Sequence, residues 1–141
     1  MDANNINIRK RDYSVGAIIT KLNNGTIEFD DGGYRSSKFI EFLLSNSPID
    51  TIVAKIYNGN ILKIYGGNAL IRSIYYYIIK DYEFNDLELF ELFNEKRYSE
   101  LKPYLQRRIE ESSLTFYVDE SYSKSDEVIK KYAEMINNMK E

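Results

Sequence analysis

The sequence predicts one α+β domain, in which a small sheet with a central hairpin packs against several helices. Residues 51–57 and 61–65 are rich in β-branched and aromatic side chains, which favour strands, and Asn58-Gly59-Asn60 joins them. Asn-Gly between two such runs is the strongest short-range signal for a β-hairpin. From residue 70 to 79, apolar side chains cover most of a helical circumference, which predicts a helix enclosed by the rest of the domain.

The segment before residue 30 is expected to form an arm, a helix and a strand. Residues 1–12 are polar and predict a flexible N-terminal arm, so that the single domain runs over 13–141. Ser14 is placed to cap a short amphipathic helix, and Gly25 to close it in the left-handed conformation. Residues 26–29 then read as a short strand.

Two further helices are predicted on either side of the hairpin and the central helix. Ser36 or Ser37 can cap the first, whose broad apolar face ends before Pro48. After the central helix, the period of residues 87–93 is ambiguous between strand and helix. The spacing of the glutamates and a possible cap at Asp86 favour a helix there.

The last forty residues predict a helix, a strand and a second helix. Pro103 is a natural first residue for a helix over 104–111. Residues 114–118 read as a strand, and an amphipathic helix begins at about Asp126. No internal repeat or linker divides the chain, which at 141 residues fits one domain.

Charge argues against one class of function. The formal net charge is −3, whereas broad binding to duplex nucleic acid normally shows as a basic excess. Basic residues do gather locally, each time with acids a few residues away, so that solvated surface charge is the favoured interpretation. The clusters are Arg9-Lys10-Arg11, Lys96-Arg97 and Arg107-Arg108.

The chain contains neither histidine nor cysteine. It therefore has no thiolate nucleophile, no Ser-His pair and no zinc site of the usual kind, and no cofactor is expected. Its first residues hold no apolar run of the signal-peptide type, and no stretch reaches the ~18 apolar residues of a membrane span. Without cysteines for disulfides, a cytoplasmic protein that does not bind membranes is the expectation.

The join between the hairpin and the central helix is the place where chemistry is first sought. Gly66, Gly67 and Asn68 stand where a strand feeds a helix, and such corners leave backbone N–H groups that can hold an anion. Gly-Gly before a helix is more often only a tight turn, which is the favoured interpretation.

The order of elements resembles a known family. Residues 18–56, including Phe39–Leu44 and Pro48-Ile49, are similar to the opening of the N-terminal domain of GmrSD-type type IV restriction enzymes, a domain of the ParB/sulfiredoxin-like superfamily. Residues 62–70 stand where that family has Ile-Asp-Gly-Gln-Gln-Arg-Leu at a strand-to-helix corner, and residues 94–109 resemble a further segment. The resemblance implies a truncated relative with a ParB/sulfiredoxin-like fold.

The departures from the family fall on its chemistry. In that alignment the motif's Asp is Tyr65, only Gly66 is kept, the two Gln are Gly67 and Asn68, and the Arg is Ala69. Loss of one group that stabilises developing charge commonly costs ~10²-fold or more in rate. Catalysis is therefore not expected.

An upstream loop retains part of the family's polar character. It reads Asp30-Asp31-Gly32-Gly33-Tyr34-Arg35, in which Arg35 is the only trace of a Gln-Arg pair. The two aspartates could offer oxygens to Mg²⁺, although adjacent acids on a solvated loop are more often turn formers.

The leading hypothesis is a non-catalytic binding protein, carried by a phage or mobile element, that binds and inhibits a host defence nuclease in the manner of anti-restriction or anti-CRISPR proteins. A protein partner is then expected. Exposed tyrosines would suit such contacts because they supply rigid area with a polar tip. The candidates are Tyr34, Tyr57, Tyr65 and Tyr122.

Two alternatives stay open. The chain could be a nucleotide-binding or nuclease domain with a reduced phosphate site made of the glycine corner, Arg35 and the Asp30-Asp31 pair. It could instead bind nucleic acid through basic side chains with a tyrosine as stacking surface. The residues of that second alternative are Arg9, Lys10, Arg11, Tyr104, Arg107 and Arg108.

Overall fold

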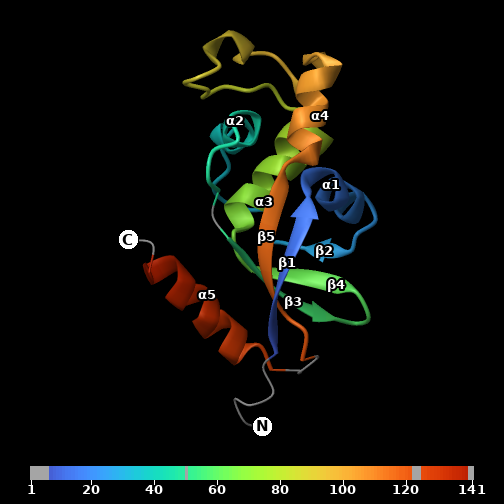
Figure 1. The fold of residues 1–141 in the computed structure, drawn as a ribbon, viewed down its shortest axis with the longest axis vertical. Coiled ribbons are helices and arrows are strands. Elements are labelled where there is room, and N and C mark those ends of the chain that lie inside the picture. The colour runs from blue at the N-terminus through green and yellow to red at the C-terminus, as the bar shows by residue number, and fades with distance from the viewer. Residues whose placement is uncertain (1–6, 50, 122–124, 140–141) are drawn as a thin grey trace.

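A computed structural model describes residues 7–49, 51–121 and 125–139. Within them, five strands form one mixed sheet in the order β1-β5-β3-β4-β2 (Figure 1). The outer pair β1/β5 and the hairpin β3/β4 are antiparallel, whereas β5/β3 and β4/β2 are parallel. The strands are β1 (Ile8–Ser14), β2 (Ile27–Glu28), β3 (Ile52–Tyr57), β4 (Ile61–Gly66) and β5 (Ser113–Asp119).

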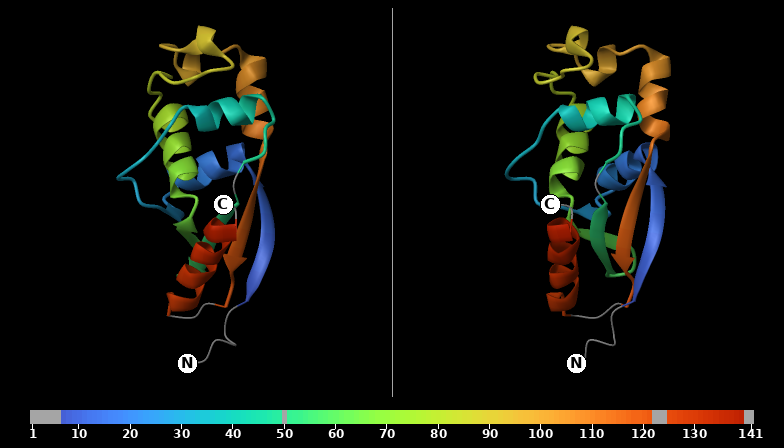
Figure 2. Two further views of the ribbon diagram at one scale, coloured as in Figure 1. Left: turned by 90° about the vertical axis from the view of Figure 1, so that its left-hand side faces the viewer. Right: turned by 60° about the vertical axis from the view of Figure 1, so that its left-hand side comes forward.

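Helices cover both faces of this sheet. Four of them lie on one face and α5 lies on the other, as the two views of Figure 2 show. The helices are α1 (Val15–Asn23), α2 (Lys38–Leu44), α3 (Asn68–Ile74), α4 (Pro103–Glu111) and α5 (Glu127–Met139). The predicted α+β class with a central hairpin is confirmed, while the ParB/sulfiredoxin-like assignment stays a prediction.

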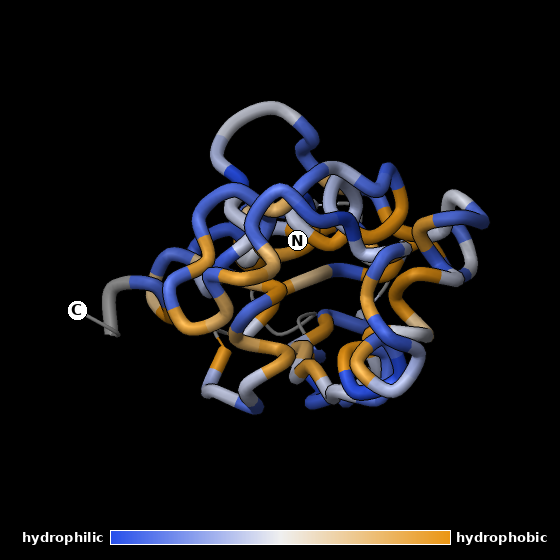
Figure 3. The backbone as a smooth tube through the Cα atoms, turned by 90° about the horizontal axis from the view of Figure 1, so that it is seen from above, coloured by the Kyte–Doolittle hydropathy of each residue, from blue (hydrophilic) through white to orange (hydrophobic). Residues whose placement is uncertain are grey.

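The main core lies between the sheet and helices α1 to α4. Apolar side chains from β3, β4 and β5 meet α3 there, and Ile71, Ile74 and Phe116 are fully buried. The other face of the sheet carries a smaller cluster, in which Ile129 and Ala133 of α5 pack on Val53. Seen from above, much of the outer backbone is hydrophilic (Figure 3).

The best-predicted elements have local causes. Ser14 accepts a hydrogen bond from the backbone N–H of Ala17 and so caps α1, and Gly25 follows that helix with φ +73°. Asn58 and Gly59 both have positive φ, as a tight hairpin turn requires. The central helix continues from α3 as a π-helical turn over Tyr75–Ile79.

Two predictions are wrong. Residues 8–12 belong to strand β1, because they pair with residues 115–119 of β5, while residues 1–6 of the expected arm lie outside the described residues. Residues 87–93 form no α-helix: only Glu91–Phe93 make a 3₁₀ turn. Asp86 caps nothing there, since its carboxylate accepts hydrogen bonds from the hydroxyls of Ser36 and Ser37.

The remaining predicted elements are found close to their expected limits. Pro103 begins α4, residues 114–118 lie within β5, and α5 begins beside Asp126. None of the described residues belongs to a helix that is long and apolar enough to cross a membrane.

Candidate functional site

The glycine corner between β4 and α3 is tightly packed. Gly67 has φ +93°, and a Cβ there would lie 2.9 Å from the Cγ1 of Ile52. A Cβ on Gly66 would lie 3.4 Å from the Cβ of Val53 and 3.6 Å from that of Ala133 in α5. Both glycines are therefore explained by backbone conformation and close packing, in line with the tight turn that the sequence favoured over an anion site.

The acidic loop, residues 30–35, does lie against this corner. The backbone N–H of Asp30 donates to the Oδ1 of Asn68 at 3.0 Å. The same asparagine donates from Nδ2 to the carbonyl of Ile64 at 3.5 Å. Asn68 therefore links the loop to the sheet, and its polar atoms serve that purpose.

Arg72 fastens the acidic loop to α3, and sequence reasoning missed it. Its side chain is 6% exposed, and Nε and Nη2 donate to the carbonyl of Asp30 at 2.8 and 2.5 Å. Nη1 donates to the carbonyl of Tyr34 at 2.5 Å. Gly33, with φ +112°, lets the loop fold over the guanidinium. The only available signal was an arginine inside an otherwise apolar helix.

The described residues bring no third metal-ligating side chain to Asp30 and Asp31. The Asp30 carboxylate lies 3.7 Å from Nη2 of Arg72 and is 72% exposed, and its Oδ1 accepts from the backbone N–H of Gly32 at 3.0 Å. Among the described residues, no group of three or more His, Cys, Asp or Glu side chains could hold a metal ion. Asp30 therefore shapes a turn.

Arg35 takes part in an aromatic cluster that we call the aromatic ladder: Phe29, Tyr75, Tyr76 and Tyr82. Successive ring centroids are 5.4, 5.2 and 5.3 Å apart. The Arg35 guanidinium lies 4.0 Å from the ring centre of Tyr76 and 5.2 Å from that of Tyr82. These cation–π contacts, together with the tilted and edge-to-face ring pairs, hold the rings in fixed positions.

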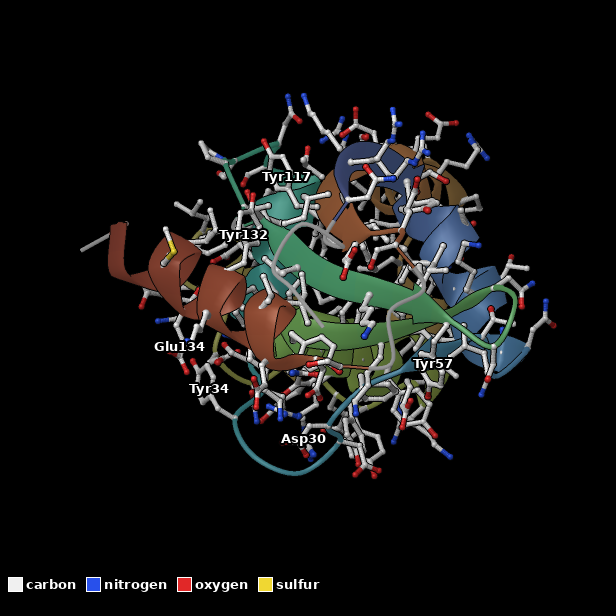
Figure 4. The ribbon with its side chains drawn as sticks, turned by 90° about the horizontal axis from the view of Figure 1, so that it is seen from below. Asp30, Tyr34, Tyr57, Tyr117, Tyr132 and Glu134 are labelled. Carbon is white, nitrogen blue, oxygen red and sulfur yellow. The ribbon has the colours of Figure 1, made fainter. Side chains whose placement is uncertain are left out.

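Only part of the predicted tyrosine set is available for contact. Tyr34 is 67% exposed, and Tyr82, which the sequence reasoning missed, is 42% exposed. Tyr57 is half-buried, donates to the carboxylate of Glu28 and lies well apart from Tyr34 (Figure 4). Tyr122 lies outside the described residues.

Tyr65, at the position of the family's Asp, is built into the packing of α5. Its hydroxyl donates to the carboxylate of Asp126 at 3.0 Å. Burial raises the pKa of the phenol, and the hydrogen bond to Asp126 adds to the rise. This side chain therefore joins β4 to α5 and offers no free acid or base.

Residues 84–96 form a compact loop at one end of the molecule, which we call the tip loop (Figure 2). Two backbone hydrogen bonds close its base, from Phe84 N–H to Lys96 and from Glu95 N–H to Phe84. Asn94 spans its interior, because its side chain accepts from the N–H of Leu87 and donates to the carbonyl of that residue. Closed loops packed by their own side chains are frequently functional.

Glu41 of α2 anchors this tip loop from below. Its side chain accepts from the backbone N–H groups of Glu88, Leu89 and Phe90 at 3.3, 2.6 and 2.8 Å. The residue is only 2% exposed. Within the loop, the rings of Phe90 and Phe93 are stacked with their centroids 5.9 Å apart. The path of the backbone is therefore fixed by the loop's own side chains as well.

The basic residues do not form one surface. Arg9 and Arg11 of β1 lie beside Glu120, and Arg11 forms two hydrogen bonds of 2.8 Å with its carboxylate. Arg107 and Arg108 lie on α4, which ends just before β5 begins at Ser113, whereas Glu120 follows the other end of that strand. Arg9 and Arg11 pair with Val118 and Phe116, so three to five residues of strand, about 10–17 Å, lie between them and the start of β5 at Ser113.

Two adjoining hollows lie between α2, α4 and the start of β5. They measure about 270 and 480 Å³ and share Leu43, Asn46 and Ser112. Arg107 and Arg108 line the larger one together with Tyr104, which is 53% exposed. Lys10 lies on the edge strand β1, away from these hollows.

Comparison with protein-family models, with curated proteins and with solved structures finds no match for this chain.

Proposed function

We propose that this chain is a non-catalytic binding protein that inhibits a host defence nuclease, of the restriction or CRISPR type, and that a phage or mobile element carries it. The observation that carries the proposal is the aromatic ladder with Arg35 inside it and Tyr34 and Tyr82 facing solvent. Tyrosine and arginine are the residues that most often dominate the energy of protein interfaces.

The anchoring of the acidic loop supports a role in binding. Arg72 takes hold of two loop carbonyls, so Tyr34 is presented from a fixed backbone. Side chains that are already ordered lose less conformational entropy when a partner binds. The ladder orders Tyr82 in the same way, because Arg35 lies against both Tyr76 and Tyr82.

The positions that depart from the restriction-enzyme motif also support the proposal. Tyr65 is engaged with Asp126, and Gly67 and Asn68 serve packing and loop attachment. Residues with these structural duties favour a scaffold that works by contact over one that works by chemistry.

The test is a plating assay in bacteria that carry one defined type IV restriction enzyme or CRISPR nuclease each. Expression of the wild-type protein is expected to restore plating of a restricted phage in at least one strain. The double substitution Tyr34→Ala with Tyr82→Ala should abolish that effect, since loss of two contact tyrosines weakens binding by ~2–4 kcal/mol.

Tyr104→Ala is the matched control, because Tyr104 is similarly exposed but lines the larger hollow beside α4, away from the aromatic ladder. It should protect the phage as well as the wild type does. Unchanged restriction in every strain, with the protein shown to be folded by circular dichroism, would refute the proposal.

A second candidate function is favoured by the larger hollow beside α4. Arg107, Arg108 and Tyr104 around it combine positive charge with an exposed ring, which suits a nucleotide or a single nucleic-acid strand. Calorimetric titration with a single-stranded oligonucleotide tests this function. Binding that weakens with salt and is lost in Arg107→Ala with Arg108→Ala, but not in Arg97→Ala, would support it.

A further inference from the structure

We propose that the tip loop is a docking site for a protein partner. The partner surface is positively charged and has an apolar hollow, as the surfaces of nucleic-acid-binding grooves do. Leu89 and Leu92 would enter the hollow. This inference rests on the proposed function in one respect only, which is that the partner surface is that of a nuclease.

The two leucines are the first reason. Leu92 is 91% exposed and Leu89 is 70% exposed, the two most exposed large apolar side chains among the described residues. The neighbouring Leu87 is buried and Phe90 and Phe93 pack against the core, so the loop divides its apolar residues between inside and outside. Exposed apolar side chains set on a rigid support mark interaction sites.

The rigidity of the support is the second reason. Three backbone N–H groups end on buried Glu41, the base of the loop is closed at Phe84, and Asn94 bridges its interior. A loop held in this way does not collapse its leucines into the core. It therefore presents them in one arrangement, which favours binding.

The charge of the loop states what kind of partner fits. The tip loop contains four carboxylates, those of Asp86, Glu88, Glu91 and Glu95, and one basic side chain, that of Lys96. Glu88 is paired with Lys38 at 2.6 Å. Glu91 and Glu95 are exposed, and in the sequence they lie one residue before and three residues after Leu92. A cationic rim around an apolar hollow complements this arrangement, and complementary charge steers association.

The position of the loop fits the same role. In Figures 1 and 2 the tip loop lies beyond α2 and beside the start of α4 at one end of the long axis, and α5 lies toward the other end. A protruding end can enter a groove that the broad faces of the domain cannot.

The experiment uses two probes with the full chain. The first is a synthetic amphipathic helix of lysine and leucine, which offers an apolar stripe with cationic borders, titrated by fluorescence anisotropy. The second is the nuclease identified by the plating assay, with duplex DNA added as competitor. Leu92→Asp is expected to weaken binding of the peptide at least about tenfold.

Charge is tested separately from apolar contact. Glu91→Lys with Glu95→Lys should weaken peptide binding several-fold and reduce its dependence on salt. Glu127→Lys with Glu134→Lys, on the exposed side of α5, is the matched control and should leave binding within twofold of the wild type. In the complex, duplex DNA should displace the wild-type protein from the nuclease.

The outcomes separate the two proposals. Peptide binding that is unaffected by Leu92→Asp and by the charge reversals at Glu91 and Glu95 would overturn the proposal that the tip loop is a docking site, even if the plating assay succeeds. A nuclease complex that DNA does not displace would overturn the claim about the partner surface. If the plating assay fails but the peptide still binds and the tip-loop substitutions weaken that binding, the proposed function is overturned and the docking role of the tip loop is supported.

Discussion

The acidic loop and the tip loop are both held by a buried charged side chain from a neighbouring helix, but the two anchors have opposite polarity. Arg72 of α3 donates to carbonyls of residues 30 and 34. Glu41 of α2 accepts from the N–H groups of residues 88–90. One loop turns its carbonyls inward and the other its amides, and each anchor matches the groups that face it.

The surroundings of the two anchors also differ. The Arg72 guanidinium has a carboxylate, that of Asp30, at 3.7 Å, whereas the Glu41 carboxylate accepts hydrogen bonds from backbone amides. Glu41 is the acceptor for three N–H groups, whereas Arg72 serves two carbonyl oxygens. A carbonyl oxygen is left without a partner more readily than an N–H group. Removal of the acid should therefore cost more than removal of the base.

The largest effect is expected for Glu41→Ala, which leaves three N–H groups without their acceptor. We expect the free energy of unfolding to fall by about 3 kcal/mol, because three N–H groups lose one charged acceptor that is itself buried. Urea denaturation followed by circular dichroism measures this change. Proteolysis within residues 84–96 should become faster at the same time.

Glu41→Gln is the control for that prediction. Its amide oxygen can still accept from part of the set, so about half of the loss should be recovered. A fall of less than about 1 kcal/mol in Glu41→Ala would contradict the claim that this side chain fixes the tip loop.

A smaller effect is expected for Arg72→Met, which keeps much of the buried side-chain volume. The free energy of unfolding should fall by about 2 kcal/mol, since three donated hydrogen bonds are lost while the desolvation cost of a buried cation is removed as well. Differential scanning calorimetry measures it, with Arg97→Met as the exposed control. A loss as large as that of Glu41→Ala would refute the proposed difference between the anchors.

The two anchors also show where sequence reasoning ends. The hairpin was predictable because Asn58 and Gly59 carry their turn in local conformational preference. The pattern of residues 87–93 predicts a helix, but the N–H groups of residues 88–90 are bound by Glu41, more than forty residues earlier in the chain. Contacts at that separation leave no local pattern, and tertiary structure overrides propensity.

The same limit applies to the candidate site. The tyrosines were named from residue type alone, and exposure selects Tyr34 and adds Tyr82. The strand of residues 8–12 was missed because it is an edge strand of mainly polar residues, and only its partner β5 reveals it. Arg35 was named for phosphate, whereas its contacts place it between tyrosine rings.

An exposed anchor sharpens the comparison and gives the smallest effect. Arg11 of β1 holds Glu120, just beyond β5, through two hydrogen bonds of 2.8 Å, and both partners are partly solvated. The hydrogen bond from Arg11, with its positive charge, lowers the pKa of the Glu120 carboxyl below its ordinary value of 4.5. A depressed pKa means that this pair stabilises the folded state above the unfolded-state value and ceases to do so as the pH falls through the folded-state value.

We therefore expect Glu120→Gln to melt at a slightly lower temperature than the wild type at neutral pH, and the difference to shrink as the pH falls below the ordinary value of 4.5 and through the lower folded-state pKa. Thermal unfolding measured at several pH values tests this. Asp126, whose pKa the hydrogen bond from Tyr65 also lowers, is present in both proteins and cancels in the difference. A difference that grew on acidification would contradict the sign of the shift. High salt should reduce the difference at neutral pH, because solvent screens an exposed pair far more than the buried contacts of Glu41 and Arg72.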